Sequence, residues 1–559
     1  MKCRWPTFSL SPFFRGKYLD AALFLLFLTL SWSLMQHTFE YRDNTFFIRD
    51  KLWSDFGAHI PLIRSFSMGG NHALEHPLFA GQPIRYHFLF YSWVGLLEKA
   101  GVNIAVALNL LSAAGLTLLL WLLYRLGSMM FANRLAGFIA VVLFWFNGSL
   151  SFLFFFQKHP FHGASWKDIV TATHFTSFGP WNGLVSIFWT LNIYTNQRHL
   201  ALSYAFILAC LWPLLKYACQ GTLLSRRSMT AIVLMAALAP LLHHAIIPIV
   251  LTYVVIWFIV SPGFVRPLGF YYFLMFLCTV PALWYIRAGQ PLEIVYCPGF
   301  VQQPKNFLEW GRYWFYNLGL YSVMIPAVFF WGKKPVKIWV GVAVVFFAAS
   351  NIWRFSPDMF NNHKLINFFM ISVQVAVAGF LASCLAGSRW FKMAGLLFLF
   401  VLTFSGIVDL FPVLNDHQGE LRDFRRSPVA VWLKDQTPPD AVYLCTTGMY
   451  CPPSLLGRRI YIGYVYFPWS AGLPAYERLR TIEPVFHPAA DSAAACRLLK
   501  QEKIDFIIVE PGHDAWPETD VRESSLLKNW EPVFSHQEGY RVYSVGRECA
   551  FLGNPYKPF

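Results

Sequence analysis

The 559-residue sequence predicts an all-α polytopic membrane domain followed by a small α/β domain outside the membrane. The first observation is composition: 56% of the residues are hydrophobic and only 13% are charged, whereas soluble proteins carry about 25% charged residues. The second is that apolar residues form long blocks without charge, such as 102–123 and 365–386. Blocks of about 17 to 25 apolar residues fit membrane-spanning helices. The third is that charge returns to ordinary levels after residue 412.

Hydropathy predicts about eleven transmembrane helices. The expected spans are 19–35, 103–123, 135–156, 200–215, 229–243, 245–260, 268–286, 315–331, 337–353, 365–386 and 393–411. Residues 183–194 are apolar but short, so we interpret them as a re-entrant or partly inserted segment.

The charges of the connecting loops predict the orientation. One set of loops is purely basic, and the other set, which includes residues 36–102, mixes both signs. Because basic loops favour the cytoplasm, we expect a cytoplasmic N-terminus, an external C-terminal domain and a plasma (inner) membrane location. This topology accounts for the net charge of +15 without a nucleic-acid partner. The basic set comprises Lys2, Arg4, Arg15 and Lys17; Arg125 and Arg134; Lys216, Arg226 and Arg227; Arg266; Lys333, Lys334 and Lys337; and Arg389 and Lys392.

We expect two domains, a transmembrane domain over 1–411 that includes the external loop 36–102, and an external domain over 412–559. In the second, the runs 441–445 and 505–509 read as buried strands, 492–503 as an amphipathic helix, and 530–535 with 539–545 as a closing hairpin. Cys445 and Cys451 are candidates for a disulfide, with unpaired cysteines as the alternative. The cysteines form no Cys-x-x-Cys pair, so we assign no metal ligands.

The loop 36–102 carries the first candidate for chemistry. If residues 52–60 are helical, Asp55 and His59 lie on one face, one turn apart, and Pro61 ends or kinks that helix. Further along are Glu75-His76-Pro77 and Arg85-Tyr86-His87. Imidazoles and carboxylates at one membrane surface suit proton transfer or metal binding, although histidines are also common interfacial fillers.

A second candidate lies at the external end of span 365–386. Arg354 and the run Asn361-Asn362-His363-Lys364 would suit an anionic headgroup at a helix start. The alternative is a membrane anchor in which Lys364 snorkels to the interface. The segments Gln197-Arg198-His199 and His243-His244 are also expected near this surface, where the histidines could simply mark a bend between two helices.

This layout resembles the C-type superfamily of integral-membrane glycosyltransferases, which includes protein O-mannosyltransferases and aminoarabinose transferases. The resemblance covers the plan of spans, the first external loop and the external C-terminal domain. It also covers short segments: Asp55-Phe-Gly-Ala-His59, Glu75-His76-Pro77, Arg85-Tyr86-His87, Asn196-Gln-Arg198, Trp314-Phe-Tyr-Asn317-Leu-Gly, Asn361-Asn-His-Lys364 and Ser405-Gly-Ile-Val-Asp409. The adjacent Asp-Glu pair of the mannosyltransferases is absent, and Asp43 is its nearest equivalent by distance from the membrane.

The resemblance implies transfer of a sugar from polyprenyl phosphate to a glycan, lipid or protein acceptor on the external face, with inversion. Asp55 would be the catalytic base, and His59 would orient it or bind a divalent ion with it; the cofactor stays open. The donor phosphate would rest near Arg85, Arg354 or Lys364. The residues assigned to substrate binding are Glu75, His76, Arg85, His87, Arg198, Arg354, Asn362 and Lys364.

Two other functions stay open from the sequence. A transporter or flippase for a lipid-linked glycan predicts broken helices with ionisable residues near the midplane, often in repeated halves. A non-enzymatic membrane assembly protein predicts a first loop that tolerates substitution. The sequence shows no internal repeat, and its polar residues gather at one surface rather than within the spans, which favours interfacial chemistry.

Overall fold

The computed structural model describes residues 17–177, 183–289, 294–302, 304–446, 448–486, 491–511 and 525–551. The chain divides into two compact units. We call Met1–Thr38 with Asn109–His417 the helical unit, and Phe39–Leu108 with Gln418–Phe559 the sheet unit. The segment between the first two spans therefore packs with the C-terminal segment of the chain. The domain boundary expected near residue 411 stays a prediction.

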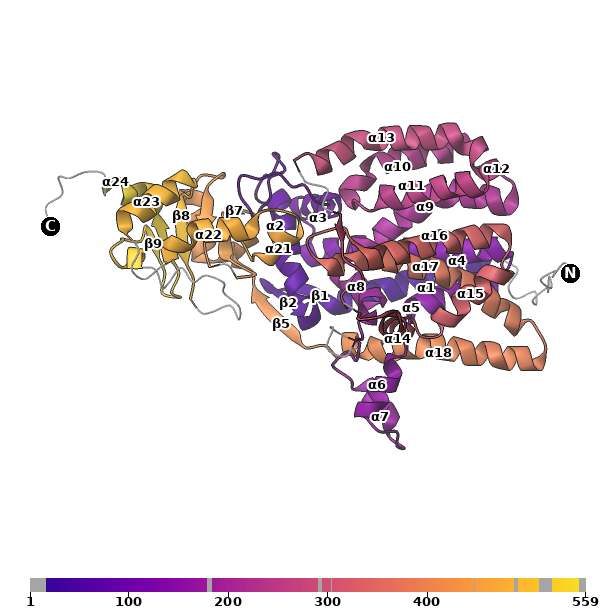
Figure 1. The fold of residues 1–559 in the computed structure, drawn as a ribbon. Helices are drawn as coiled ribbons and strands as arrows, with labels where there is room; N and C mark the ends of the chain where they lie inside the picture. Colours follow the sequence, from indigo (N-terminus) through magenta and orange to yellow (C-terminus); the bar gives the residue numbers. More distant parts are fainter. Residues whose placement is uncertain are drawn as a thin grey trace. The chain divides into compact units, whose positions relative to one another are not determined.

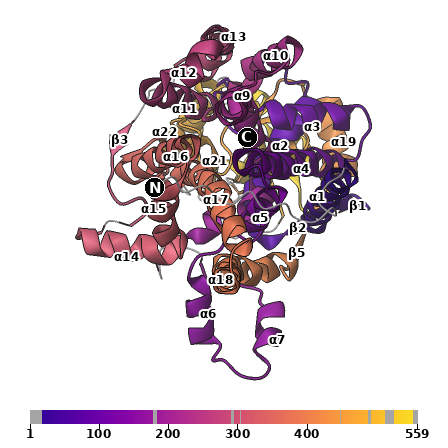
Figure 2. The ribbon, with the colours of Figure 1, turned by 90° about the vertical axis from the view of Figure 1, so that its right-hand side faces the viewer.

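Among the described residues, seven helices are long and apolar enough to cross a membrane, and a bent helix pair could form an eighth span. This confirms a polytopic all-α membrane domain, but not the expected count of about eleven spans. Figure 1 shows the long helices side by side, and Figure 2 views them end-on. They are α1 (Lys17–Thr38), α4 (Ile104–Phe131), α9 (Leu200–Gln220), α12 (Pro262–Val265) continued through η5 (Arg266–Leu268) into α13 (Gly269–Arg287), α16 (Lys334–Ile352), α17 (His363–Leu385) and α18 (Arg389–Leu414).

Four expected spans fall on helices outside those seven. Three overlap α5 (Arg134–Trp145), α10 (Arg226–Leu242) and α11 (Ile246–Val260), and the fourth overlaps the bent pair α14 (Phe307–Leu318) and α15 (Tyr321–Trp331). The last pair is bent by 88°, at Gly319, whose φ is +58°. The expected span 135–156 breaks after α5 because the backbone at Phe146 packs directly on α18. A Cβ on Gly406 would lie only 2.3 Å from the carbonyl carbon of Phe146.

Short elements complete the helical unit. Residues 183–194 contain only the turn η4 (Ser186–Trp189) and the start of α8 (Asn192–Asn196). No described helix there is therefore long enough to span a membrane. The helix α17 is the most buried of the seven candidate spans, with 83% of its most apolar stretch buried. The short elements are α6 (Ser151–Lys158), α7 (Ser165–Val170), η4 (Ser186–Trp189), α8 (Asn192–Asn196), β3 (Val295–Tyr296), β4 (Trp353–Arg354) and η6 (Met359–Asn362).

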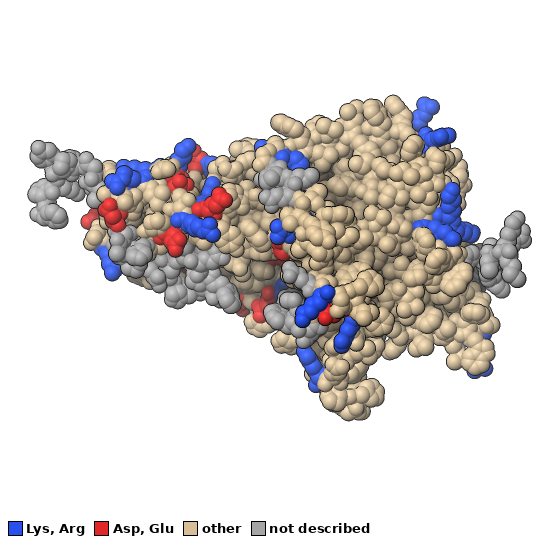
Figure 3. All heavy atoms as spheres, viewed as in Figure 1, with Lys and Arg blue, Asp and Glu red and all other residues tan. Residues whose placement is uncertain are grey.

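Basic residues gather at one end of the helical unit. Figure 3 shows blue Lys and Arg side chains along its right-hand edge and no red carboxylates on that edge in this view. The loops and helix ends that carry the purely basic clusters, for example Arg266 between α12 and α13 and Lys333 before α16, belong to this unit. The asymmetry is the pattern that the positive-inside rule describes.

The sheet unit contains two sheets. In the three-stranded sheet, β2 (Thr45–Arg49) pairs antiparallel with both β1 (Phe39–Arg42) and β5 (Gln418–Arg422). The five-stranded sheet has the order β7-β6-β8-β10-β9. Its strands are β6 (Val442–Leu444), β7 (Arg459–Ile460), β8 (Phe506–Val509), β9 (Phe534–Ser535) and β10 (Arg541–Ser544). Around them lie η2 (Asp50–Leu52), α2 (Trp53–Ser67), α3 (Leu89–Lys99), η7 (Phe424–Arg426), α19 (Pro428–Gln436), α20 (Pro452–Leu455), α21 (Tyr466–Ser470), α22 (Ala475–Phe486), α23 (Ser492–Gln501), η9 (Ser525–Lys528) and α24 (Val545–Phe551).

The elements expected in the C-terminal segment are present. Strands β6 and β8 lie within the two runs predicted as buried strands and pair in parallel, and α23 lies within the predicted amphipathic helix. Strands β9 and β10 form the predicted antiparallel pair. The disulfide in this segment joins Cys496 to Cys549, not Cys445 to Cys451.

Candidate functional site

Asp55 and His59 lie one turn apart on α2, as the sequence predicts. The helix begins at Trp53, so the Asp55 carboxylate lies in the first turn, where the helix dipole favours negative charge. Pro61 does not end the helix, which continues to Ser67. The helix continues because the packing of its buried face outweighs the one backbone hydrogen bond that proline removes. The residues of this face recur with helical spacing and are Phe56, Gly57, His59, Ile60, Pro61, Ile63, Arg64 and Ser65.

The two candidate catalytic side chains differ in exposure. Asp55 is partly exposed, whereas His59 is only 7% exposed. The His59 imidazole stacks on Tyr91 of α3, with ring centroids 4.6 Å apart and planes inclined by 28°. The centroid of the Phe56 ring lies 5.5 Å from that of His59. His59 is therefore held in a fixed orientation by aromatic packing.

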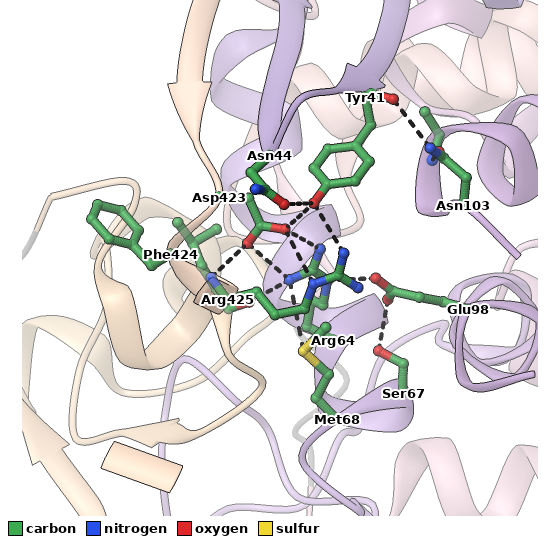
Figure 4. Close-up of polar contacts among 12 residues, drawn as sticks. Tyr41, Asn44, Arg64, Ser67, Met68, Glu98, Asn103, Asp423, Phe424 and Arg425 are labelled. Atoms are coloured by element: carbon green, nitrogen blue, oxygen red, sulfur yellow. Dashed lines mark hydrogen bonds and ion pairs between the residues drawn. The ribbon is translucent and has the colours of Figure 1, made fainter. Parts of the chain in front are cut away.

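Arg64 anchors the same helix, and sequence reasoning did not single it out. Figure 4 shows its guanidinium between two carboxylates. Nε lies 2.7 Å from Oε1 of Glu98 on α3, and the two terminal nitrogens donate to both oxygens of Asp423, at 3.2 and 3.0 Å. One of these nitrogens also donates to the carbonyl of Leu455 at 3.0 Å. The Arg64 side chain is fully buried, so paired carboxylates are needed to compensate its charge.

Each carboxylate has a further donor. Ser67 Oγ donates to Glu98 at 2.7 Å, and Tyr41 Oη donates to Asp423 at 2.8 Å, as Figure 4 shows. Burial by itself would raise the pKa of Asp423, but the charge of Arg64 and the hydrogen bonds that Asp423 accepts hold it below its ordinary value. The network therefore joins α2 to α3, to β1 and to the segment that follows β5. It fixes the helix that carries Asp55.

Glu75, assigned to substrate binding, is already engaged within the sheet unit. Its carboxylate forms an ion pair with Arg459 and accepts a hydrogen bond from the backbone N–H of Gly81 at 2.6 Å. The Asn71 side chain holds the backbone N–H and carbonyl of Glu75, at 2.8 and 2.7 Å. Glu75 and Arg459 also line a cavity of about 90 Å³.

His76 is partly buried in the same loop. Its Nδ1 has no hydrogen-bond partner among the described residues. Burial, together with the positive charge of Arg478, lowers the pKa of His76 to about 4. Arg478 is itself fixed, because its guanidinium lies 3.5 Å from the centroid of the Phe79 ring and donates to the carbonyl of Ala80 at 2.7 Å. His76 is thus neutral at pH 7.

Arg85 and His87, also assigned to substrate binding, follow in the last part of the loop. Arg85 is partly exposed, and His87 is 4% exposed with its ring centroid 3.7 Å from that of Tyr86.

Asp43, the nearest equivalent of the absent acidic pair, lies in the turn between β1 and β2. Its φ is +50° there, and Asp tolerates this region better than most residues.

In the helical unit, Arg198 is fully buried before α9. Its terminal nitrogens donate to Oγ1 of Thr38 at 2.8 Å and to Oδ1 of Asn109 at 3.2 Å, and one lies 2.8 Å from Sδ of Met35. These contacts hold the Arg198 guanidinium inside the helical unit.

The structure brings the predicted Arg198-His199, His243-His244 and His363-Lys364 segments together. The rings of His199 and His243 stack with centroids 5.5 Å apart, and His243 is in electrostatic reach of His363 and Lys364. Lys364 is 5% exposed, and its ammonium donates to Oδ1 of Asn361 at 2.9 Å. We call His199, His243, His244, His363 and Lys364 the basic cluster. The Lys364 ammonium and the imidazole N–H groups can donate hydrogen bonds to an anion.

Two other predicted residues lie just before α17. Asn362 is 2% exposed and donates to the backbone carbonyls of Ser350 and Trp353, at 3.0 and 2.6 Å. Its amide therefore stabilises the entry to α17. Arg354 lies on β4 and is partly buried, and its Nε has no hydrogen-bond partner among the described residues.

Asp409 on α18 is a buried acidic residue to which the sequence reasoning assigned no role. It is 4% exposed, and Ser177 Oγ lies 3.4 Å from its Oδ2. The sequence feature that could have identified Asp409 is a carboxylate inside an otherwise apolar span. Such groups are rare in membranes and are often functional.

No protein-family model matches the sequence. No curated protein sequence matches it either. Among solved structures, ArnT from Cupriavidus metallidurans in the apo state matches with a TM-score of 0.51 at 12% identity, over 94% of this chain and 97% of that chain. The chain shares its fold with this aminoarabinose transferase, a C-type membrane glycosyltransferase. The resemblance predicted from the sequence is thereby confirmed at the level of the fold.

Two further matches have lower scores. ArnT bound to undecaprenyl phosphate gives a TM-score of 0.49 at 11% identity, over 94% of this chain and 97% of that chain. The oligosaccharyltransferase AglB from Archaeoglobus fulgidus, in complex with an inhibitory peptide and a dolichol-phosphate, gives 0.44 at 12% identity, over 94% of this chain and 74% of that chain.

Proposed function

We propose that the chain is a membrane glycosyltransferase that moves a sugar from a polyprenyl-phosphate donor to an acceptor on the external face of the inner membrane. The observation that carries this proposal is the fold shared with ArnT over nearly the full length of both chains. ArnT has also been solved bound to undecaprenyl phosphate, which is the carrier we propose for the donor here. The N-terminus is cytoplasmic and the sheet unit is external.

Asp55 is the general base in this mechanism. The carboxylate takes the proton from an acceptor hydroxyl as that oxygen attacks the anomeric carbon of the donor sugar. The bond from the anomeric carbon to the phosphate oxygen breaks, and the polyprenyl phosphate leaves with the electron pair. One displacement of this kind inverts the anomeric configuration. The first-turn position on α2 suits a carboxylate that stays ionised between turnovers.

The remaining residues hold substrates or hold Asp55 in place. His59 orients the Asp55 face of α2, because its ring is fixed against Tyr91. Lys364 and Arg354 bind the donor phosphate and stabilise the charge that develops on it as the sugar leaves. A glycan, lipid or protein supplies the acceptor hydroxyl.

Sugar transfer by the purified chain tests this function. The chain in liposomes is given radiolabelled sugars on polyprenyl phosphate together with glycan, lipid or protein acceptors, and label is counted in every product that separates from the donor lipid. Transfer to a soluble or lipid acceptor supports the proposal. Movement of the intact labelled lipid between leaflets without cleavage of the sugar–phosphate bond would indicate a flippase instead. Neither reaction with any donor would favour a non-enzymatic assembly protein.

A further inference from the structure

Three metal-ligating side chains meet in the sheet unit, away from the residues discussed above. They are Cys445, Cys451 and Glu510. One sulfur from each cysteine and one carboxylate oxygen all lie within 4.8 Å of one another. Cys445 and Cys451 are close in the sequence, but Glu510 comes from a distant segment, so the fold is needed to complete the group.

The topology of the five-stranded sheet explains this meeting. Strands β6 and β8 are parallel neighbours, with Leu444 opposite Ile507. Cys445 directly follows β6 and Glu510 directly follows β8, so both side chains stand at the carboxyl edge of the sheet. This edge is where α/β sheets commonly bind ligands. Cys451 comes from the next segment, immediately before α20.

We propose that Cys445, Cys451 and Glu510 bind one Zn²⁺ ion that stabilises the carboxyl edge of this sheet. Zinc takes thiolate sulfur at about 2.3 Å and carboxylate oxygen at about 2.0–2.2 Å in tetrahedral sites. Ligand atoms already within 4.8 Å of one another reach these distances by small side-chain rotations. The two thiols release their protons on binding, and water completes the fourth position.

Burial and chemistry favour zinc over a hard cation. The side chains of Cys445 and Cys451 are 0% and 2% exposed and belong to one hydrophobic core of the sheet unit. Two buried sulfur ligands suit zinc, whereas magnesium and calcium select oxygen. The Glu510 carboxylate is partly exposed and contributes the third negative charge.

The redox state of the other cysteines gives an independent reason. The same unit contains the disulfide between Cys496 and Cys549, which is typical of an oxidising compartment. In such a compartment, a bound zinc ion would keep Cys445 and Cys451 as thiolates and protect them from oxidation. This inference does not depend on the proposed sugar transfer.

Metal content of the full chain tests the site. The protein is purified in detergent, saturated with Zn²⁺ and passed through a desalting column, and zinc is measured by mass spectrometry. We expect about one zinc ion per chain, and less than a tenth of that in Cys445→Ser and Cys451→Ser. Cys278→Ser, a cysteine of the helical unit, is the matched control and keeps its zinc. Absence of zinc from the wild type, or its retention in both serine variants, overturns the proposal.

Two further measurements guard against misfolding of the serine variants. Glu510→Gln keeps both thiols and the side-chain shape. We expect it to lower the zinc affinity by about tenfold or more, since loss of a residue that only hydrogen-bonds to a metal ligand already lowers metal affinity by that factor. Alkylation without reduction, followed by peptide mass spectrometry, reads the thiols directly. Zinc should protect Cys445 and Cys451 from alkylation. Recovery of a Cys445–Cys451 disulfide as the main form would contradict the site.

Discussion

The guanidinium of Arg64 and the carboxylate of Asp423, 359 residues apart in the sequence, form two hydrogen bonds at 3.2 and 3.0 Å inside the sheet unit. Both side chains are fully buried. This pair ties the helix that carries Asp55 to the C-terminal segment. Residues 39–108 and the C-terminal segment are therefore parts of one folded unit.

We expect Arg64→Met to lower the stability of the sheet unit by about 3–5 kcal/mol, because it leaves Glu98 and Asp423 buried without their counter-charge. Thermal unfolding of the purified chain measures the effect. The matched control is Arg422→Met, which removes the largely exposed ion pair with Glu538 and should cost about 0–1 kcal/mol. Similar shifts in the two variants would contradict a structural role for the buried network.

The same network predicts a loss of stability in acid. The pKa of Asp423 is lower in the folded chain than in the unfolded chain. Its contribution is therefore fully present above the unfolded value of 3.8 and is lost as the pH falls from there through the folded value. Unfolding temperatures between pH 5 and pH 2.5 should fall more steeply in the wild type than in Asp423→Asn. The same dependence of unfolding temperature on pH in both proteins would contradict this role of Asp423.

His76 predicts a second pH effect in a higher window. The pKa of His76 is about 4 in the folded chain, below its ordinary value of 6.5. Between these two pH values the unfolded chain therefore binds a proton at His76 and the folded chain does not. Stability should therefore decline as the pH falls from about 6.5 toward 4. His76→Gln removes this part of the decline, whereas His72→Gln, an exposed neighbour in the same loop, should leave it. The unfolding temperature at pH 7 and pH 5 is the measurement.

Lys364 should act on the donor rather than on the acceptor. We expect Lys364→Gln to raise the KM for the lipid-phosphate donor by about 10–100-fold, because a charged hydrogen bond to phosphate contributes about 1.5–3 kcal/mol. Lys333→Gln changes an exposed lysine of the same unit and should leave the KM unchanged. A selective rise in the KM for the acceptor would remove Lys364 from the phosphate site.

Hydropathy predicted the membrane class because a bilayer imposes a length and a composition on each span. It could not predict where a span breaks for a local contact. The α5 helix ends before the residues that pack on Gly406, and only the three-dimensional approach of two backbones shows why. Likewise, the bend between α14 and α15 lies in an apolar run with no marker except Gly319.

Local spacing in the sequence predicted the local structure around the candidate residues. The turn between Asp55 and His59 follows from helical period, and the strands β6 and β8 follow from apolar runs. Long-range partners left no such signal. The pairing of β2 with β5, the ion pair of Glu75 with Arg459 and the anchoring of Arg64 all join residues hundreds of positions apart. The sequence likewise gave no sign that Glu75 accepts a hydrogen bond from Gly81 or that Asn362 donates one to Trp353, and their roles in substrate binding stay predictions.

The rate of sugar transfer by Asp55→Asn is the most direct test of the central claim. With saturating donor and acceptor, we expect kcat to fall by about 10²–10⁴-fold, which is the usual contribution of a positioned base. Asp43→Asn, which changes the other acidic candidate of the same loop, should transfer at nearly the wild-type rate. Transfer by Asp55→Asn at the wild-type rate, in membranes where the wild type is active, would contradict the role of Asp55.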